Sequence, residues 1–180
     1  MKKIAIFFAE GYEEIEALTV VDLCRRAGIL VDMVSVTDSL QVTGAHGIPV
    51  VMDKMLAEVE FDTLDMLVLP GGMPGTRNLE QVPLLMEQVK AFAAAGKYIA
   101  AICAAPSVLG RLGILQGKQA TCYPGFEAYL GESYIDGLVV ESKNIITAKG
   151  PGLSSDFAFC LVEKLAGSEV ADQVYDAAQY

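Results

Sequence analysis

Basic side chains are scarce in this chain of 180 residues: 13 lysines and arginines stand against 23 aspartates and glutamates, for a formal net charge of −10 at pH 7. Nucleic acids and anionic membrane surfaces repel such a charge, so we expect neither as a partner. No apolar run approaches the roughly 20 residues that span a bilayer, and no basic leader precedes an apolar segment. These absences predict a cytoplasmic protein that does not enter a membrane.

Common metal ligands are also few. The chain has one histidine and four cysteines, with no C-x-x-C pair, so we expect no Cys/His metal site. A disulfide framework is not expected either, because such frameworks belong to small, cysteine-dense secreted domains. The histidine, His46, lies between Gly44 and Gly47. We interpret it as a solvated loop residue, unless the loop folds over a reactive cysteine.

Apolar residues make up 53% of the chain and charged ones 20%, the balance of a globular protein with a large core. The length is most simply that of one domain, residues 1–180, without linker, repeat or low-complexity tract. Short apolar runs, typical of buried strands, alternate with segments of helical spacing. Strands are predicted at Lys2–Phe8, Leu30–Val36, Asp65–Leu69, Gly96–Ile102, near Lys118–Thr121, Gly137–Glu141 and Asn144–Ala148, with a hairpin or edge excursion within Leu40–Val51.

The alternation of strands and helices predicts an α/β fold: a doubly wound parallel sheet sandwiched by helices. In such sheets, ligands bind beyond the carboxyl ends of the strands. That rule singles out the loop after Phe8, the loop after Leu69 and the turn at Cys103. Helices are predicted at Glu14–Ala27, Val82–Ala95, Ala104–Leu112, Ser154–Ala166 and Glu169–Ala178.

Cys103 is the most informative residue, because it lies where the predicted strand Gly96–Ile102 gives way to the predicted helix Ala104–Leu112. Unpaired N–H groups and the dipole at a helix N-terminus stabilise a thiolate, the attacking form of cysteine. Flanking alanines leave room for a sharp turn of the nucleophile-elbow type. The sequence therefore predicts a cysteine that is ionised at neutral pH. The alternative is a small hydrophobe packed at a strand end.

The loop after Phe8 carries four glutamates within residues 10–16. Glu13 and Glu14 are explained by the preference of carboxylates for the first turn of a helix. Glu16 is different, because its turn is expected to point back towards the strand ends. A carboxyl held against a thiolate in a dry pocket has a raised pKa and can donate a hydrogen bond while protonated. We interpret Glu16 as the acid partner of a reactive cysteine.

Glycines follow the strand that ends at Leu69, in the sequence Pro70-Gly71-Gly72. Glycine lets the backbone approach a ligand closely, and its N–H groups can form an oxyanion hole. An ordinary glycine-rich turn is the alternative here. The Gly-Pro-Gly at residues 150–152 is interpreted as a turn into the following helix, with a ligand contact as the alternative.

For three further cysteines and one tyrosine, packing in the core is the alternative to a role at the site. Cys24 and Cys160 fall on the apolar faces of predicted helices and are interpreted as packing residues. Cys122 lies beside the possible site, and its role stays open. The ring of Tyr123 lines a pocket near Cys103 in one interpretation and packs in the core in the other.

Five segments together resemble the ThiJ/PfpI superfamily, in the branch of the Parkinson-associated deglycases and glyoxalase III enzymes. The resemblance implies a flavodoxin-like sheet of the class I glutamine amidotransferase type and a homodimer. It also implies a nucleophile at Cys103, a protonated carboxyl at Glu16 and backbone donors at Gly72 and Ala104. The segments are G-Y-E-E-I-E at 11–16, V-D-L-C-R-R-A-G at 21–28, L-P-G-G at 69–72, A-A-I-C-A-A-P at 100–106 and T-A-K-G-P-G at 147–152.

Two positions depart from the patterns of this superfamily. Protease-like relatives carry histidine directly after the nucleophile, where this chain has Ala104. Some relatives of the deglycase branch place histidine in a T-x-H-P segment, where this chain has Tyr123. A Cys-His hydrolase is therefore disfavoured, and Glu16 would have to move any proton alone.

The leading hypothesis is a cofactor-free enzyme that acts on small reactive dicarbonyls, of glyoxalase III or deglycase type. Cys103 would attack the aldehyde of methylglyoxal or glyoxal, and Glu16 would move a proton between the adjacent carbons. One alternative is a redox-sensing stress-response chaperone in which Cys103 rests at the sulfinic stage. Another is a peptidase or amidase, which would need His46 or a partner subunit to supply a base.

Overall fold

The computed structural model describes all residues, 1–180. Its main sheet has seven strands in the order β5-β2-β1-β6-β7-β9-β8, and every neighbouring pair is parallel except β8 with β9. A separate antiparallel hairpin pairs β3 with β4. The strands are β1 Lys3–Phe8, β2 Leu30–Ser35, β3 Gln41–Thr43, β4 Pro49–Val51, β5 Lys54–Met55, β6 Met66–Leu69, β7 Tyr98–Ile102, β8 Val139–Ser142 and β9 Ile145–Ala148.

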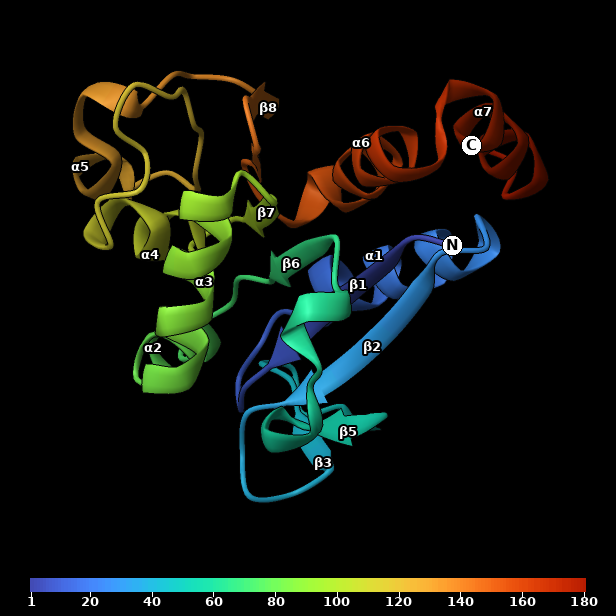
Figure 1. Cartoon of the computed structure of the whole chain (residues 1–180), viewed down its shortest axis with the longest axis horizontal. Helices are drawn as coiled ribbons and strands as arrows, with labels where there is room; N and C mark the ends of the chain where they lie inside the picture. The colour runs from blue at the N-terminus through green and yellow to red at the C-terminus, as the bar shows by residue number, and fades with distance from the viewer.

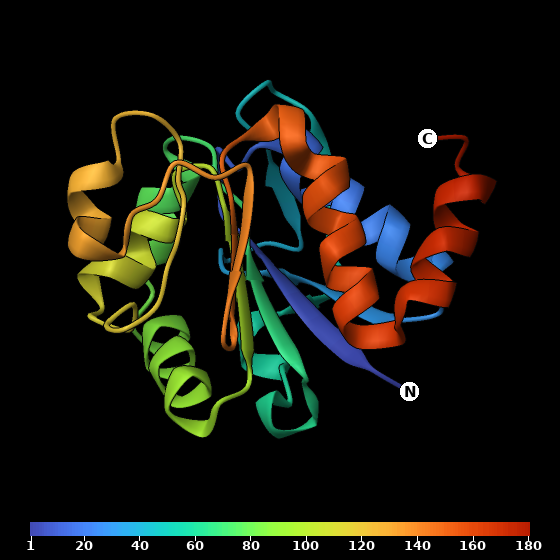
Figure 2. The ribbon, with the colours of Figure 1, turned by 90° about the horizontal axis from the view of Figure 1, so that it is seen from above.

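Helices cover both faces of the main sheet (Figures 1 and 2). One face carries α1, α6 and α7, and the other carries α2 to α5, as the view from above shows most clearly (Figure 2). The predicted doubly wound α/β fold is confirmed. The helices are α1 Glu14–Arg26, α2 Gly75–Glu80, α3 Pro83–Ala95, α4 Pro106–Arg111, α5 Glu127–Leu130, α6 Ser154–Ala166 and α7 Ser168–Ala177.

Two hydrophobic cores lie on the two faces of the sheet, and β1 shows how the sequence supplies both. Its side chains alternate, because successive residues of a strand point to opposite faces. Ile4 and Ile6 pack in the core beneath α1 and α6, while Ala5 and Phe7 pack in the core beneath α3 and α4. All four are fully buried. A run that is apolar at every position thus indicates a strand covered on both sides.

Parallel pairing brings the carboxyl ends of β1, β6 and β7 to one edge of the sheet. Ile6 of β1 pairs with Val68 of β6, and Leu69 of β6 pairs with Ala101 of β7. The loops that leave these strands therefore meet at one edge. They are the three segments that the sequence analysis singled out.

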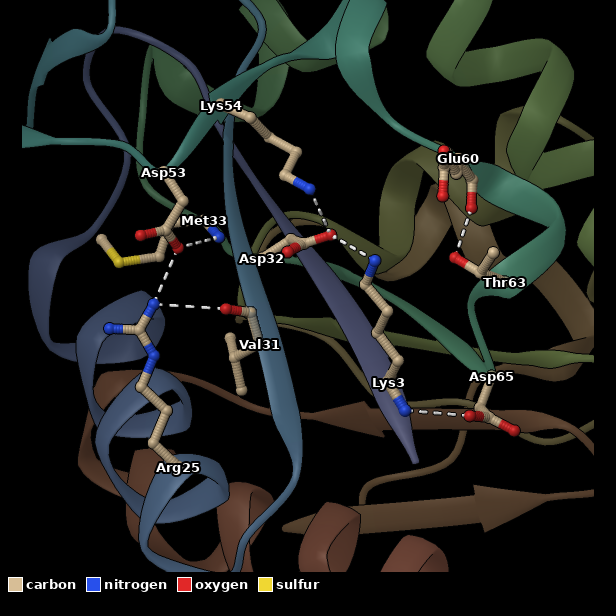
Figure 3. A network of polar contacts seen from close by, with 10 residues as sticks. All are labelled: Lys3, Arg25, Val31, Asp32, Met33, Asp53, Lys54, Glu60, Thr63 and Asp65. Atoms are coloured by element: carbon tan, nitrogen blue, oxygen red, sulfur yellow. Dashed lines mark hydrogen bonds and ion pairs between the residues drawn. The ribbon is translucent and has the colours of Figure 1, made fainter. Parts of the chain in front are cut away.

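Ion pairs and hydrogen bonds of charged residues join the strands β1, β2 and β5 (Figure 3). The Asp32 carboxylate of β2 lies 3.1 Å from Lys3 Nζ of β1 and 3.0 Å from Lys54 Nζ of β5. Asp53 accepts hydrogen bonds from Arg25 and from the Met33 N–H. These contacts fasten the short edge strand β5 to its neighbour.

The structure differs from the sequence prediction in the short elements. Residues 118–121 form no strand; Ala120 makes only an isolated bridge with Tyr134. The helices α2 and α5 were not predicted, because six and four residues are too few to show a helical period. The two-residue strand β5 was missed for the same reason. No helix has the length and apolar character needed to cross a membrane.

Candidate active site

Cys103 forms the sharp turn between β7 and α4. Its φ of 64° lies in the left-handed region, which costs a non-glycine residue about 1–2 kcal/mol. Two hydrogen bonds hold the strained backbone: the Cys103 N–H donates to the Ala148 carbonyl at 2.9 Å, and the Cys103 carbonyl accepts from the Tyr123 N–H at 2.8 Å. The residue is 9% exposed. This geometry is that of a nucleophile elbow, in which the side chain projects from the strand end.

Glu16, in the first turn of α1, is the buried acid beside this turn. It is 1% exposed, and its Oε2 accepts a hydrogen bond of 2.8 Å from the Gly71 N–H. Its other oxygen, Oε1, is buried without a hydrogen-bond partner. Burial raises the pKa of Glu16 to about 7, against the lowering effect of its hydrogen bonds with Cys103 and Gly71. A carboxyl of this kind is half protonated near neutral pH.

The Cys103 thiol and the Glu16 carboxyl are coupled. Burial raises the pKa of Cys103, and the charge and hydrogen bonding of Glu16 raise it further, whereas the N–H groups of Gly72 and Ala104 lower it. Protonating Glu16 removes the repelling charge and leaves both amide donors in place. The pair is therefore arranged to hold one proton between two sites that cannot both be charged. The prediction that the helix N-terminus ionises Cys103 at neutral pH is therefore wrong: burial and Glu16 raise the pKa of the thiol, and its ionisation depends on the protonation of Glu16.

Gly71 and Gly72 occupy positions that admit no side chain. A Cβ on Gly71 would lie 2.6 Å from Glu16 Oε2 and 2.7 Å from Cys103 Cβ. A Cβ on Gly72, whose φ is 86°, would lie 2.4 Å from the Glu13 backbone nitrogen. The two glycines thus let the loop after β6 reach between α1 and the elbow. Without them, neither the Gly71 nor the Gly72 N–H could approach its acceptor.

A second cluster of polar side chains lies next to the site. One of its members is Glu13, whose negative charge raises the pKa of Glu16. His46 Nδ1 lies 2.8 Å from Glu14 Oε2 and 3.6 Å from Glu13 Oε1, and the His46 N–H donates to Glu14 Oε1 at 2.8 Å. His46, whose side chain is 66% exposed in the turn between β3 and β4, is a solvated loop residue as predicted, and its contacts with Glu14 tie this hairpin to α1. Glu14 is only 5% exposed, so it is more deeply buried than the preference of carboxylates for the first turn of a helix requires.

These three side chains are also the residues able to hold a metal ion, because their ligand atoms lie within 4.8 Å of one another. Their hydrogen bond and ion pair explain the arrangement without one. The hydrogen bond to Glu14 and the charge of Glu13 raise the pKa of His46. Burial opposes ionisation of Glu14, but its hydrogen bonds, the largest from His46, keep its pKa below the usual range. Sequence reasoning missed the pairing because 32 residues separate the partners.

Of the remaining candidates, Tyr123 lies closest to the elbow, since its own N–H contacts Cys103, and its side chain is 45% exposed. Cys122 points away, into the core on the other face of the sheet, and burial raises its pKa to about 11. Cys24 is fully buried, and Cys160 is half-buried on α6. Packing accounts for these three cysteines.

A doubly wound α/β sheet that ends in a strained cysteine turn, with a buried acid and two amide donors at the sulfur, defines the class of cysteine-elbow proteins built on the flavodoxin-like fold. The chain matches the DJ-1/PfpI family over residues 2–164 and belongs to that family. The predicted relationship to the ThiJ/PfpI superfamily and its amidotransferase-like fold is confirmed.

Relatives of similar sequence support the DJ-1 branch. The chain is 36% identical to the protein dj-1beta of Drosophila melanogaster over 96% of this chain and 94% of that protein. It is 38% identical to DJ-1 homolog B of Arabidopsis thaliana over 96% of its length, but spans only 40% of that plant protein. It is also 36% identical to the glutathione-independent glyoxalase DJR-1.2 of Caenorhabditis elegans, over 89% of this chain and 86% of that enzyme.

Among solved structures, oxidized DJ-1 of Toxoplasma gondii superposes with a TM-score of 0.96 at 37% identity, over 100% of this chain and 99% of that one. The elements that carry the elbow, the acid and the glycine loop are thus part of a shared architecture.

Proposed function

We propose that this protein is a cofactor-independent cysteine enzyme of the glyoxalase III or deglycase type, which converts methylglyoxal to lactate. The observation that carries the proposal is the coupled pair: a strained, nearly buried Cys103 against a protonatable Glu16, with two amide N–H groups at the sulfur. The glutathione-independent glyoxalase among the relatives supports this choice of reaction.

In the proposed mechanism, the Cys103 thiolate attacks the aldehyde carbon and the carbonyl oxygen takes a proton, which gives a hemithioacetal. Glu16 removes the hydrogen from that carbon and returns a proton to the neighbouring carbon through an enediol, so that the first carbon is oxidised and the second reduced. Water then hydrolyses the resulting thioester, which releases lactate and restores the thiol. General acid–base catalysis of this kind contributes roughly 10²–10⁴-fold.

The N–H groups of Gly72 and Ala104 serve the first and last steps. They already point at the sulfur, so an oxygen formed on the adjacent carbon would lie within their reach. Preorganised donors of this kind stabilise an oxyanion at no reorganisation cost. Gly71 has a supporting role, since its N–H orients the Glu16 carboxyl.

Lactate production from methylglyoxal by purified protein tests the proposal. Replacing Cys103 with alanine should abolish turnover. Cys160→Ala should leave turnover unchanged, because Cys160 lies half-buried on α6, away from the elbow. Equal activity in wild type and Cys103→Ala would refute the assignment of the nucleophile.

A second candidate function is redox sensing at the same cysteine, favoured by the oxidized state of the Toxoplasma relative. The thiolate would attack one peroxide to give a sulfenic acid and a second peroxide to give a sulfinic acid, with one water released at each step. Mass spectrometry after mild peroxide should then find two added oxygen atoms on Cys103 alone. Oxidation of all four cysteines to the same extent would exclude a sensor.

We further propose that the protein acts in the cytoplasm as a homodimer. Three exposed apolar side chains support a self-association face. Ile15 of α1 is 57% exposed, and Ile48 and Val51 of the hairpin are 51% and 65% exposed. The bonds between Glu14 and His46 bring these two elements together.

A further inference from the structure

A cavity of about 270 Å³ opens beside the elbow, and the proposed reaction leaves it unused. Tyr123 and Pro124 form one wall, and residues 149–153 form the other. It lies at the carboxyl-end edge of the sheet, where the connections after β7 and β9 run.

Both walls of this cavity are attached to Cys103 by backbone hydrogen bonds. Tyr123 donates its N–H to the Cys103 carbonyl, and the Cys103 N–H donates to Ala148, the residue before Lys149. Both walls of the cavity therefore adjoin the backbone of Cys103. A substrate bonded to the sulfur would thus have this space close to it.

The lining favours an uncharged, flat, apolar group. The Tyr123 ring, at 45% exposure, presents an aromatic face that the core does not occupy. Lys149 is the one charged residue of the lining, and its ammonium is already paired with Asp136 at 2.6 Å. An aromatic group stacked on this ring gains a favourable interaction beyond the apolar area that it buries.

Gly150 sets the width of the cavity at the Tyr123 ring. A Cβ on Gly150 would lie 3.1 Å from the ring. The backbone there is extended, with a φ of 174°, and any residue can adopt it. A side chain at position 150 is thus limited by space and not by conformation, so Gly150→Ala narrows the cavity without straining the backbone.

We propose that this cavity binds the aromatic or bulky apolar substituent of the carbonyl substrate, and that Tyr123 determines this specificity. The reaction in this proposal rests on the proposed function, whereas the binding of an apolar group in the cavity does not depend on it. A methyl group occupies only a small part of about 270 Å³, since even a water's share of the liquid is roughly 30 Å³. Arylglyoxals should therefore be better substrates than methylglyoxal.

Steady-state kinetics with phenylglyoxal and methylglyoxal test the specificity. Wild type should prefer phenylglyoxal in kcat/KM by about tenfold, and Tyr123→Ala should lose that preference. Gly150→Ala should lose it too, since its Cβ pushes against the ring. Tyr175→Ala is the matched control: Tyr175 is 47% exposed on α7, and its removal should keep the preference. Equal kcat/KM for both substrates in wild type would overturn the proposal.

Alkylation of Cys103 provides a readout that does not depend on turnover. The thiolate displaces iodide from iodoacetamide or from N-benzyl iodoacetamide, with one carbon–sulfur bond formed and one carbon–iodine bond broken. The benzyl reagent should react with Cys103 about tenfold faster in wild type, but not in Tyr123→Ala or Gly150→Ala. If this preference appears without any glyoxalase activity, the pocket stands and the proposed reaction fails. If both reagents react at equal rates, the pocket assignment fails, whatever the turnover.

Discussion

At the scale of single residues, the buried Glu16 carboxylate lowers the stability of the folded protein when it is ionised. Its pKa in the folded protein is about 7, above the ordinary value of 4.5. Ionisation of Glu16 is thus harder in the folded than in the unfolded chain, so this carboxyl removes stability as the pH rises from 4.5 through 7. Glu16→Gln should therefore stabilise the protein at pH 8, by about 3 kcal/mol, and have little effect at pH 4.

Chemical denaturation of wild type and Glu16→Gln at the two pH values measures this difference. The glutamine can still accept from the Gly71 N–H, so the hydrogen bond that fixes the side chain is kept. A difference in unfolding free energy that does not change with pH would show that Glu16 is not the titrating group.

The pair of His46 and Glu14 gives a stabilising contribution that is largest at intermediate pH. The pKa of His46 is raised and that of Glu14 is lowered, so the ion pair stabilises the fold between those two values. The contribution disappears as the pH rises through the pKa of His46 and as it falls through the pKa of Glu14. The loss of melting temperature in His46→Ala should therefore be largest near pH 6 and smaller at pH 4 and pH 9. A loss that grows steadily towards pH 9 would exclude the ion pair as its cause.

At the scale of elements, the loop after β6 depends on Gly72 for both conformation and space. Gly72→Ala should reduce turnover by about 10²–10³, the usual cost of one misplaced oxyanion donor. Gly96→Ala separates the two causes, because Gly96 has a φ of 70° but nothing within 4 Å of its Cβ position. It should cost about 1 kcal/mol of stability and leave turnover unchanged. Similar turnover in the two variants would show that close approach at Gly72 is unimportant.

The elements that the sequence predicts best are those with a long periodic pattern or a clear end signal. The helix α3 is an example: Pro83 begins it and Gly96, at φ 70°, ends it, within one residue of the prediction. The prediction of a strand at 118–121 is wrong, although these residues resemble a buried strand in sequence. Ala120 and Thr121 are buried like strand residues, but they are bound by a loop and by the Thr147 side chain instead of a neighbouring strand.

Some residues of the site can likewise be placed from the sequence, and others cannot. Residues next to a strand end, such as Cys103 and Gly71, can be placed from sequence because chain order fixes where the strand stops. The contact of His46 with Glu14 cannot, because it depends on how a hairpin folds over a helix. Gly150-Pro151-Gly152 is predicted as a turn into α6, and Pro151–Leu153 form a short 3-10 helix there. The position of this segment opposite Tyr123 is set by the pairing of β9 with β7.

At the scale of the whole molecule, the proposed homodimer predicts a particle of twice 19.2 kDa in sedimentation equilibrium. Ile48→Glu should shift it to the monomer, because a buried unpaired charge at an interface is strongly unfavourable. Leu138→Glu, at a residue 63% exposed before β8, is the matched control and should leave the dimer intact. A wild-type particle of 19.2 kDa would contradict the dimer.

The central claim is that Cys103 and Glu16 share one proton, so that the thiol can ionise while Glu16 keeps the proton. Iodoacetamide labelling from pH 5 to pH 10, followed by mass spectrometry at each cysteine, tests it directly. Cys103 should be labelled at lower pH than Cys122 and Cys160, whose pKa values burial raises to about 11. Labelling of Cys103 only at the alkaline end, together with the other thiols, would contradict the account.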